Sequence, residues 1–189
     1  MSKASQVILL CEDKLHAVFV RRFLKARGYT NRDFRVAQYP ASGRGSGESF
    51  VRRAYPDELR AYRQRSARAT TFLIAVIDAD TKAVADREAQ FEQACEQASV
   101  PPRQGDELVV HAIPRRAINT WLAYLDGIDV DEATDYKTQG YGFRKCEADI
   151  SALVKRLHDL CTEDALPEGA PPSLRHACEE FARIKGYLR

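Results

Sequence analysis

The stretch TFLIAVIDAD, residues 71–80, decides the fold class of this chain. It opens with a continuous apolar run, which is typical of a strand buried on both faces in the middle of a parallel sheet. The segment QVILLC at 6–11 has the same character, and it too is followed by acidic residues. Weaker strand patterns occupy 34–39 and 107–112, so the sequence predicts four strands.

Helical patterns separate these strands. Apolar residues recur at helical spacing from Lys14 to Gly28, and 50–67 predicts a basic helix that Pro56 interrupts near its start. Further helices are expected at 81–99, 113–125, 149–162 and 173–187. This alternation predicts an α/β fold with a mostly parallel, Rossmann-like four-stranded sheet flanked by helices. We expect a core at 1–125 and, at 126–189, an irregular segment and C-terminal helices that pack on it.

Composition narrows the class of protein. The 189 residues are 44% hydrophobic and 30% charged, and no apolar run is long enough to span a membrane. The N-terminus lacks the pattern of a secretory signal. The cysteines show no C-x-x-C pair, so we expect reduced, mostly buried thiols in a cytoplasmic protein, with neither a disulfide framework nor a zinc finger. They are Cys11, Cys95, Cys146, Cys161 and Cys178.

Charge is distributed unevenly along the chain. The formal net charge is only +2, but residues 14–68 hold 14 Lys and Arg against four acidic residues. The remainder is acidic. This asymmetry indicates a polyanionic partner, and a solvated Arg-rich surface is the alternative interpretation.

Three acidic residues follow the two strongest strands, namely Glu12, Asp78 and Asp80. Carboxylates at the end of a buried strand are partly desolvated, and a divalent cation is the usual compensation. Asp78 and Asp80 are two residues apart on extended chain, so both can face one ion. Oxygen ligands of this kind favour Mg²⁺ or Mn²⁺. A helix N-cap is the alternative role for Asp80.

The segments VILLCED (7–13) and FLIAVIDAD (72–80) resemble the Toprim domain of topoisomerases, primases and nucleases of the overcoming-lysogenisation-defect (OLD) type. The opening of the chain, 7–29, is also similar to small stand-alone bacterial Toprim-like proteins, many of them associated with phage defence. The resemblance implies that Glu12 is the general acid/base and that Asp78 and Asp80 bind metal. Glu12 as a metal ligand stays open.

Other classes fit the pattern less well. Haloacid-dehalogenase phosphatases place D-x-D on the first strand, and response-regulator receivers need a lysine after a fifth strand. The P-loop ending G-K-[ST] is absent. A Toprim topoisomerase or primase needs further domains that 189 residues do not supply. Nuclease is the Toprim activity that remains.

Several neighbouring residues are candidates for supporting roles. Lys82 could meet the scissile phosphate, and the loop at 42–48 could approach a phosphate through its backbone. Toprim-like relatives are expected to carry an acid where this chain has Asn119, which puts a two-metal site in doubt. We assign no role to the four histidines. The predicted nucleic-acid-binding residues are Lys14, Arg21, Arg22, Arg44, Arg52, Arg53, Arg115 and Arg116.

The sequence therefore supports two main hypotheses. The first is a Mg²⁺- or Mn²⁺-dependent nuclease that acts on nucleic acid, with DNA favoured over RNA. The second is a non-catalytic nucleic-acid-binding or regulatory subunit of a larger complex that contains an ATPase. A phosphate-ester enzyme with a small substrate is a third hypothesis.

Overall fold

A four-stranded sheet in the order β2-β1-β3-β4 lies at the centre of the protein, and all its strand pairs are parallel. The structure is a computed structural model and describes residues 3–36, 47–141, 143–162 and 166–188. It confirms the predicted α/β class and the Rossmann-like parallel sheet. The strands are β1 (Gln6–Cys11), β2 (Phe34–Val36), β3 (Thr71–Val76) and β4 (Val109–Ala112).

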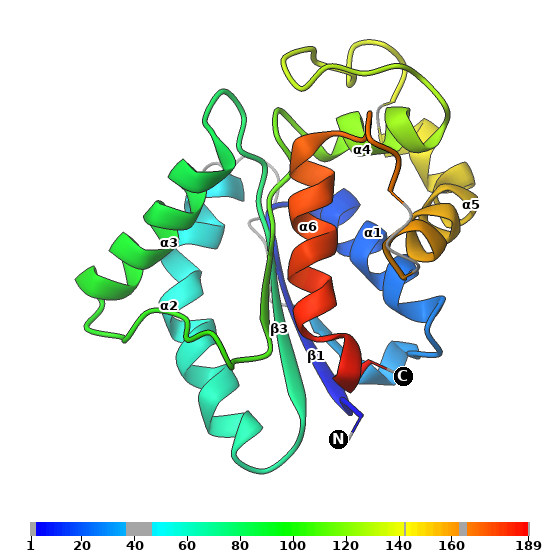
Figure 1. Ribbon diagram of the computed structural model, residues 1–189. Coiled ribbons are helices and arrows are strands. Elements are labelled where there is room, and N and C mark those ends of the chain that lie inside the picture. The colour runs from blue at the N-terminus through cyan, green and yellow to red at the C-terminus, as the bar shows by residue number, and fades with distance from the viewer. Residues whose placement is uncertain (1–2, 37–46, 142, 163–165, 189) are drawn as a thin grey trace.

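Helices cover both faces of this sheet (Figure 1). Two of them, α2 (Gly47–Ser66) and α3 (Val84–Gln97), pack on one face, and the others lie on the opposite side. Two short 3₁₀ turns occupy Asn31–Asp33 and Lys185–Tyr187. The helices of the second layer are α1 (Lys14–Lys25), α4 (Ile118–Leu125), α5 (Phe143–Thr162) and α6 (Pro172–Arg183).

Alternation along the central strands divides the core into two layers. Val7 and Leu9 of β1 face α1, whereas Ile8 and Leu10 face α2. Successive side chains of a strand point to opposite faces, so a strand covered on both sides must be apolar throughout. All six residues of β3 are buried, which explains why this stretch gave the clearest signal in the sequence.

Helix α2 differs from the prediction at Pro56. The expected interruption is absent, and the helix runs unbroken from Gly47 to Ser66 with Pro56 buried inside it. A proline costs the helix a hydrogen bond, but buried Val51, Tyr55 and Leu59 anchor the helix against the sheet on both sides of the proline.

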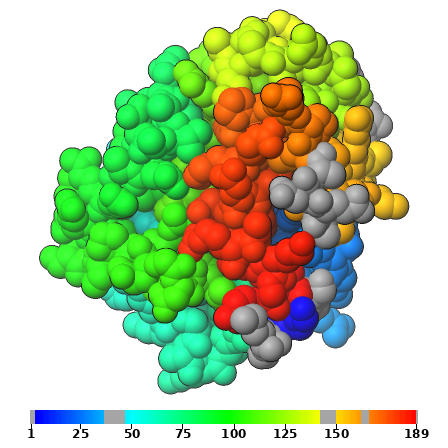
Figure 2. All heavy atoms as spheres, viewed as in Figure 1, coloured from blue at the N-terminus to red at the C-terminus, as the bar shows by residue number. Residues whose placement is uncertain are grey.

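The C-terminal helices share the core of the α1 layer through residues such as Ile150, Val154 and Leu174. Helix α6 also packs along β4, and Figure 2 shows the C-terminal part of the chain as a band down the middle of one face. The backbone N–H of Ala4 donates to the Tyr187 carbonyl at 2.9 Å, which ties the two ends of the chain together. None of the described helices is long and apolar enough to cross a membrane.

One prediction about the cysteines is wrong. Cys161 on α5 and Cys178 on α6 form a disulfide, because packing brings together two helices whose cysteines are 17 positions apart. Cys11 and Cys95 are buried free thiols, as predicted, and the side chain of Cys146 lies outside the described part of the chain.

Candidate metal centre

Glu12 and Asp78 lie at the same edge of the sheet, just beyond the ends of β1 and β3. These strands are neighbours, with Cys11 paired to Val76. The backbone N–H of Asp78 donates to Glu12 Oε2 at 3.1 Å. Open parallel sheets place their ligand sites beyond the carboxyl ends of the strands. Two of the three predicted acidic residues therefore meet where the fold favours a site.

His16, on the first turn of α1, completes the group. One ligand atom from each of Glu12, His16 and Asp78 lies within 4.8 Å of the other two. The imidazole links two carboxylates: Nδ1 is 2.7 Å from Asp13 Oδ1 and Nε2 is 2.9 Å from Asp78 Oδ1. The backbone N–H of Ile118 also donates to Asp78 Oδ1, at 2.9 Å. Asp78 is thus fixed from two helices and is almost completely buried.

The pKa values of Glu12, His16 and Asp13 are all shifted from their ordinary values. Burial and then the negative charge of Asp78 raise the pKa of Glu12 to about 7. Burial opposes a charged imidazole, but Asp78 and Asp13 outweigh it and raise the pKa of His16 to about 10. Burial also opposes ionisation of Asp13, yet its hydrogen bond with His16 lowers that pKa to about 2. His16 is therefore an imidazolium at neutral pH, and Glu12 titrates near neutral pH.

This donor set fits a divalent cation. Carboxylate oxygens of Glu12 and Asp78 are hard ligands suited to Mg²⁺ or Mn²⁺, and an added imidazole nitrogen favours Mn²⁺ over Mg²⁺. His16 can serve as a ligand only after it loses the Nε2 proton. In the described geometry it acts instead as a positioning residue for Asp78.

The start of α2 closes over Glu12. A Cβ built on Gly47 would lie 2.4 Å from the Glu12 backbone oxygen and 2.5 Å from Glu12 Cγ. Only glycine allows this approach. The first turn of a 20-residue helix is thereby brought against the acidic group, and its amide groups carry partial positive charge.

Asp80 does not join the group that the D-x-D spacing predicted. Its φ of 56° places it in the left-handed region, so the rule that residues two apart on a strand face the same way does not hold here. Its carboxylate instead accepts from Arg87 Nη2 at 3.0 Å. Arg87, buried on α3, also donates to the Asp78 carbonyl at 3.0 Å and pairs with Glu48 on α2. This arginine fastens three segments around the site.

The remaining candidates near the site take varied positions. Lys82 is exposed. Asn119 is buried; its side-chain amide donates to the Tyr141 carbonyl, and its Oδ1 has no described hydrogen-bond partner. Lys137, which the sequence did not suggest, has its Nζ 3.8 Å from Asp78 Oδ2 while remaining half exposed.

The predicted nucleic-acid-binding residues are distributed over several elements. Lys14, Arg22, Arg53 and Arg115 are exposed, whereas Arg44 lies outside the described residues. Arg53 donates to the Ser49 carbonyl at 3.3 Å, and three more of the predicted residues have side-chain partners. Arg21 donates to Asn31, Arg52 pairs with Glu48 at 2.8 Å, and Arg116 lies 3.8 Å from Asp135.

Three residues of the candidate site were not predicted from the sequence: His16, Arg87 and Lys137. His16 had a usable signal, because it follows Glu12 by four residues and Asp13 by three, and such neighbours share one side of a helix start. Asp13 itself caps α1, accepting from the backbone of Leu15 and His16. Arg87 and Lys137 had no signal, since each reaches the site only through tertiary packing.

No protein-family model matches the chain, and neither a curated protein nor a solved structure shows significant similarity to it.

Proposed function

We propose that this protein is a metal-dependent nuclease that hydrolyses phosphodiester bonds, with Mg²⁺ or Mn²⁺ held by Glu12 and Asp78. The observation that carries the proposal is the convergence of Glu12, His16 and Asp78 within 4.8 Å at the carboxyl edge of the sheet. Keeping two neighbouring, largely buried carboxylates ionised costs free energy of folding unless a cation or a proton compensates their charge.

Each residue of the group has a separate role in the proposed hydrolysis. A bound divalent cation supplies Lewis-acid chemistry, polarising the phosphodiester and stabilising the leaving oxygen. Glu12, with a pKa of about 7 in the metal-free site, is suited to accept the proton of the attacking water. His16 and the Ile118 amide hold Asp78 Oδ1, which leaves Oδ2 available to a ligand. Lys137 lies 3.8 Å from Oδ2 and can contact a phosphate that approaches it.

The substrate class proposed here follows from the distribution of positive charge along the chain. Residues 14–68 carry a formal charge of +10, and Lys14, Arg22 and Arg53 on α1 and α2 are exposed. These helices lie on opposite faces of the sheet, and exposed cations of this kind bind a phosphate backbone without reading its sequence, in a salt-dependent manner. We infer a nucleic-acid substrate in the cytoplasm, with DNA favoured over RNA. The Toprim resemblance, with its links to OLD-type nucleases and phage defence, belongs to the same proposal.

A second function is favoured by Asp80 and Asn119. Asp80 is engaged by Arg87, and Asn119 offers an amide where a Toprim-like relative is expected to have an acid. The site then holds two carboxylates, which is few for a two-metal mechanism. This observation favours a non-catalytic, nucleic-acid-binding subunit that works beside an ATPase.

Metal binding and cleavage separate the two functions. Mn²⁺ titration calorimetry on the whole chain should show one site, which Asp78→Asn removes. Incubation with plasmid DNA, single-stranded DNA and RNA in Mg²⁺ or Mn²⁺ should give cleavage that Asp78→Asn or Glu12→Gln reduces by about 10³-fold or more, the scale of losing an essential acid/base or metal ligand. If the Glu12→Gln variant still binds Mn²⁺ but does not cleave, Glu12 is the base. If the variant no longer binds Mn²⁺, Glu12 is a metal ligand.

Asp106→Asn is the matched control, because Asp106 is an exposed carboxylate on a turn remote in sequence from the group. Cleavage that persists in both Asp78→Asn and Glu12→Gln contradicts the nuclease. Tight nucleic-acid binding without Mn²⁺ uptake or cleavage supports the binding subunit instead.

A further inference from the structure

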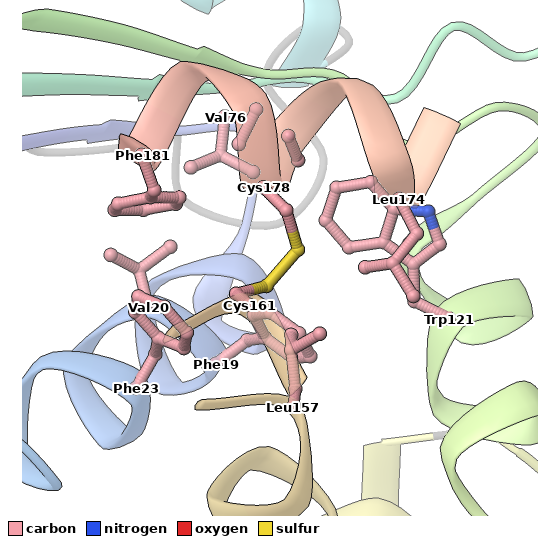
Figure 3. A pocket seen from close by; sticks show the side chains of 12 residues that line it. Phe19, Val20, Phe23, Val76, Trp121, Leu157, Cys161, Leu174, Cys178 and Phe181 are labelled. Carbon is pink, nitrogen blue, oxygen red and sulfur yellow. A yellow bond between two sulfur atoms is a disulfide. The ribbon is translucent and has the colours of Figure 1, made fainter. Parts of the chain in front are cut away.

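Helix α6 lies between the apolar layer of α1 and the edge strand β4. Cys178 and Phe181 point into an apolar pocket, and the bond from Cys178 to Cys161 ties this side of α6 to α5 (Figure 3). That pocket holds a cavity of only about 10 Å³, so protein fills it. His176 is two positions from Cys178 and therefore points to the other side of the helix. Packing thus fixes α6 as a platform for His176.

On that other side, His176 lies beside a carboxylate from the opposite helical layer. Glu88 Oε1, on α3, is 3.5 Å from His176 Nε2 and 3.7 Å from His111 Nδ1, on β4. Because β4 is the last strand of the sheet, α3 and α6 can meet around its edge although they cover different faces (Figure 1). Three elements that are separate in the sequence therefore bring one carboxylate and two imidazoles together.

The distances within this group are unlike those of a strong hydrogen bond, which joins N and O at about 2.7–3.2 Å. They are closer to the spacing of neighbouring ligands around a tetrahedral zinc ion, about 3.3–3.5 Å for bonds of 2.0–2.1 Å. Arg103 Nη2 also lies 3.8 Å from Glu88 Oε1, but Arg103 pairs with Glu180. The two imidazoles are thus the nearest described partners of this oxygen.

His111 is already oriented as a ligand. It is only 4% exposed, and its Nε2 lies 2.8 Å from the Tyr55 hydroxyl. Its Nδ1, which faces Glu88, has no hydrogen-bond partner among the described residues. A histidine that binds metal usually has its second ring nitrogen fixed by a hydrogen bond. With the proton on Nε2, where the Tyr55 oxygen accepts it, the lone pair of Nδ1 is available to an ion.

His176 can complete the group by a rotation of its ring. Among the described residues, only Glu12, His16 and Asp78 already have all three ligand atoms within 4.8 Å of one another. The two imidazoles at β4 must therefore come closer to share an ion. The side chain of His176 is 29% exposed, and its Nδ1 has no hydrogen bond within the described part of the chain. Rotation of this ring consequently breaks no short hydrogen bond described for its nitrogens.

We propose that Glu88, His111 and His176 form a second metal site, which takes Zn²⁺. Two imidazole nitrogens and one carboxylate oxygen are an established donor set for zinc, and imidazole suits Zn²⁺ better than Mg²⁺. A cavity of about 100 Å³ lies against Glu88 and His111, which leaves room for a water as the fourth ligand. The proposal does not depend on the nuclease function, because no residue is shared with the first metal centre.

Titration of Zn²⁺ into the metal-free, full-length Asp78→Asn variant tests the site without the first centre. We expect one Zn²⁺ per chain. Adding His176→Gln or Glu88→Gln should weaken the affinity by at least about 10–100-fold, the loss that follows when even a hydrogen-bond partner of a ligand is removed. The same titration of the unsubstituted chain in excess Mn²⁺, which occupies the first centre, is the second measurement and should give the same result.

Two matched controls lie on α3. Glu92 is exposed one turn after Glu88, and Cys95 is a buried thiol two turns after it; both line the cavity. Two turns are about 11 Å along a helix, so Cys95 is too far from Glu88 to share its ion. Glu92→Gln and Cys95→Ser should therefore leave Zn²⁺ affinity unchanged.

Zn²⁺ should also raise the urea midpoint of the native protein, because an ion bound by α3, β4 and α6 favours the folded state. His176→Gln should remove this shift. The proposal is overturned if the native protein takes up no Zn²⁺, if His176→Gln and Glu88→Gln leave the affinity unchanged, or if Cys95→Ser abolishes binding. Zn²⁺ uptake at this site without Mn²⁺ binding at Asp78 leaves the second site standing and contradicts the proposed function alone.

Discussion

Two histidine–carboxylate clusters in the described part of the protein each contain a buried histidine, and the pKa values of these two histidines shift in opposite directions. In the first, His16 contacts Asp13 and Asp78 at 2.7 and 2.9 Å, and its pKa rises to about 10. In the second, on the other side of the sheet, Glu88 Oε1 lies 3.7 Å from His111 Nδ1 and 3.5 Å from His176 Nε2. Burial lowers the pKa of His111.

The two buried histidines differ in the balance between burial and neighbouring charge. Asp78 and Asp13 outweigh burial for His16, whereas burial and the nearby Arg103 outweigh Glu88 for His111. His111 has uncharged partners instead. Its Nε2 lies 2.8 Å from the Tyr55 hydroxyl, and its ring packs against Phe91. The first cluster thus holds a charged histidine, His16, at the edge of the sheet. In the second cluster, His111 packs among aromatic side chains of the core.

One arginine lies beside each cluster. Substituting these two arginines is expected to give the most different losses of stability at the two clusters. Arg87 is 2% exposed and holds Asp80, Glu48 and the Asp78 carbonyl. Arg87→Met leaves the buried Asp78 carbonyl without its donor and removes one ion-pair partner from Glu48 and from exposed Asp80, so it should lower the free energy of unfolding by about 1–3 kcal/mol. Urea denaturation of the metal-free protein measures it.

Arg103→Met is the matched variant at the second cluster. Arg103 is 21% exposed and pairs with Glu180, which Arg183 also contacts at 3.0 Å. A remaining partner for Glu180 limits the expected loss to about 1 kcal/mol. Equal losses in the two variants contradict the idea that the metal-centre cluster is the more tightly fixed one.

The sequence predicted those parts of the molecule whose signals are local. The apolar run at 71–76 identified β3, and the acids after the two strongest strands located the site edge at Glu12 and Asp78. Asp80 could not be placed, because its left-handed backbone and its bond to Arg87 depend on packing. The Cys161–Cys178 pair was unpredictable for the same reason: only tertiary structure brings α5 and α6 together.

The pH dependence of stability should separate the two histidines. His16 has a folded pKa of about 10 against about 6.5 when unfolded. Its stabilising contribution is therefore complete below pH 6.5 and is lost as pH rises toward 10. His111 has a lowered folded pKa, so its contribution is present above pH 6.5 and is lost as pH falls.

Unfolding free energies of the metal-free protein between pH 5 and pH 10 measure both effects. His16→Gln should flatten the decline above pH 6.5, by an amount on the order of a few kcal/mol. His111→Gln should flatten the smaller decline below pH 6.5. Groups that do not interact with the substituted histidine titrate alike in all three proteins and cancel, whereas Glu12, whose pKa depends on the charge of His16, contributes to the His16→Gln difference. Parallel profiles for the two variants contradict the assigned charges.

Two glycines, one beside each cluster, also separate the clusters. Gly47 touches Glu12, and an added Cβ would meet its backbone oxygen at 2.4 Å, whereas a Cβ on Gly105 meets nothing within 4 Å. Gly47→Ala should therefore cost about 1–3 kcal/mol of overpacking and weaken Mn²⁺ binding by about tenfold, because Glu12 must move away from Asp78. Gly105→Ala, in the segment next to Arg103, should change stability by less than about 0.5 kcal/mol. Calorimetry of both variants with Mn²⁺ decides the point: unchanged binding in Gly47→Ala means that Glu12 tolerates displacement and is not a ligand in a rigid site.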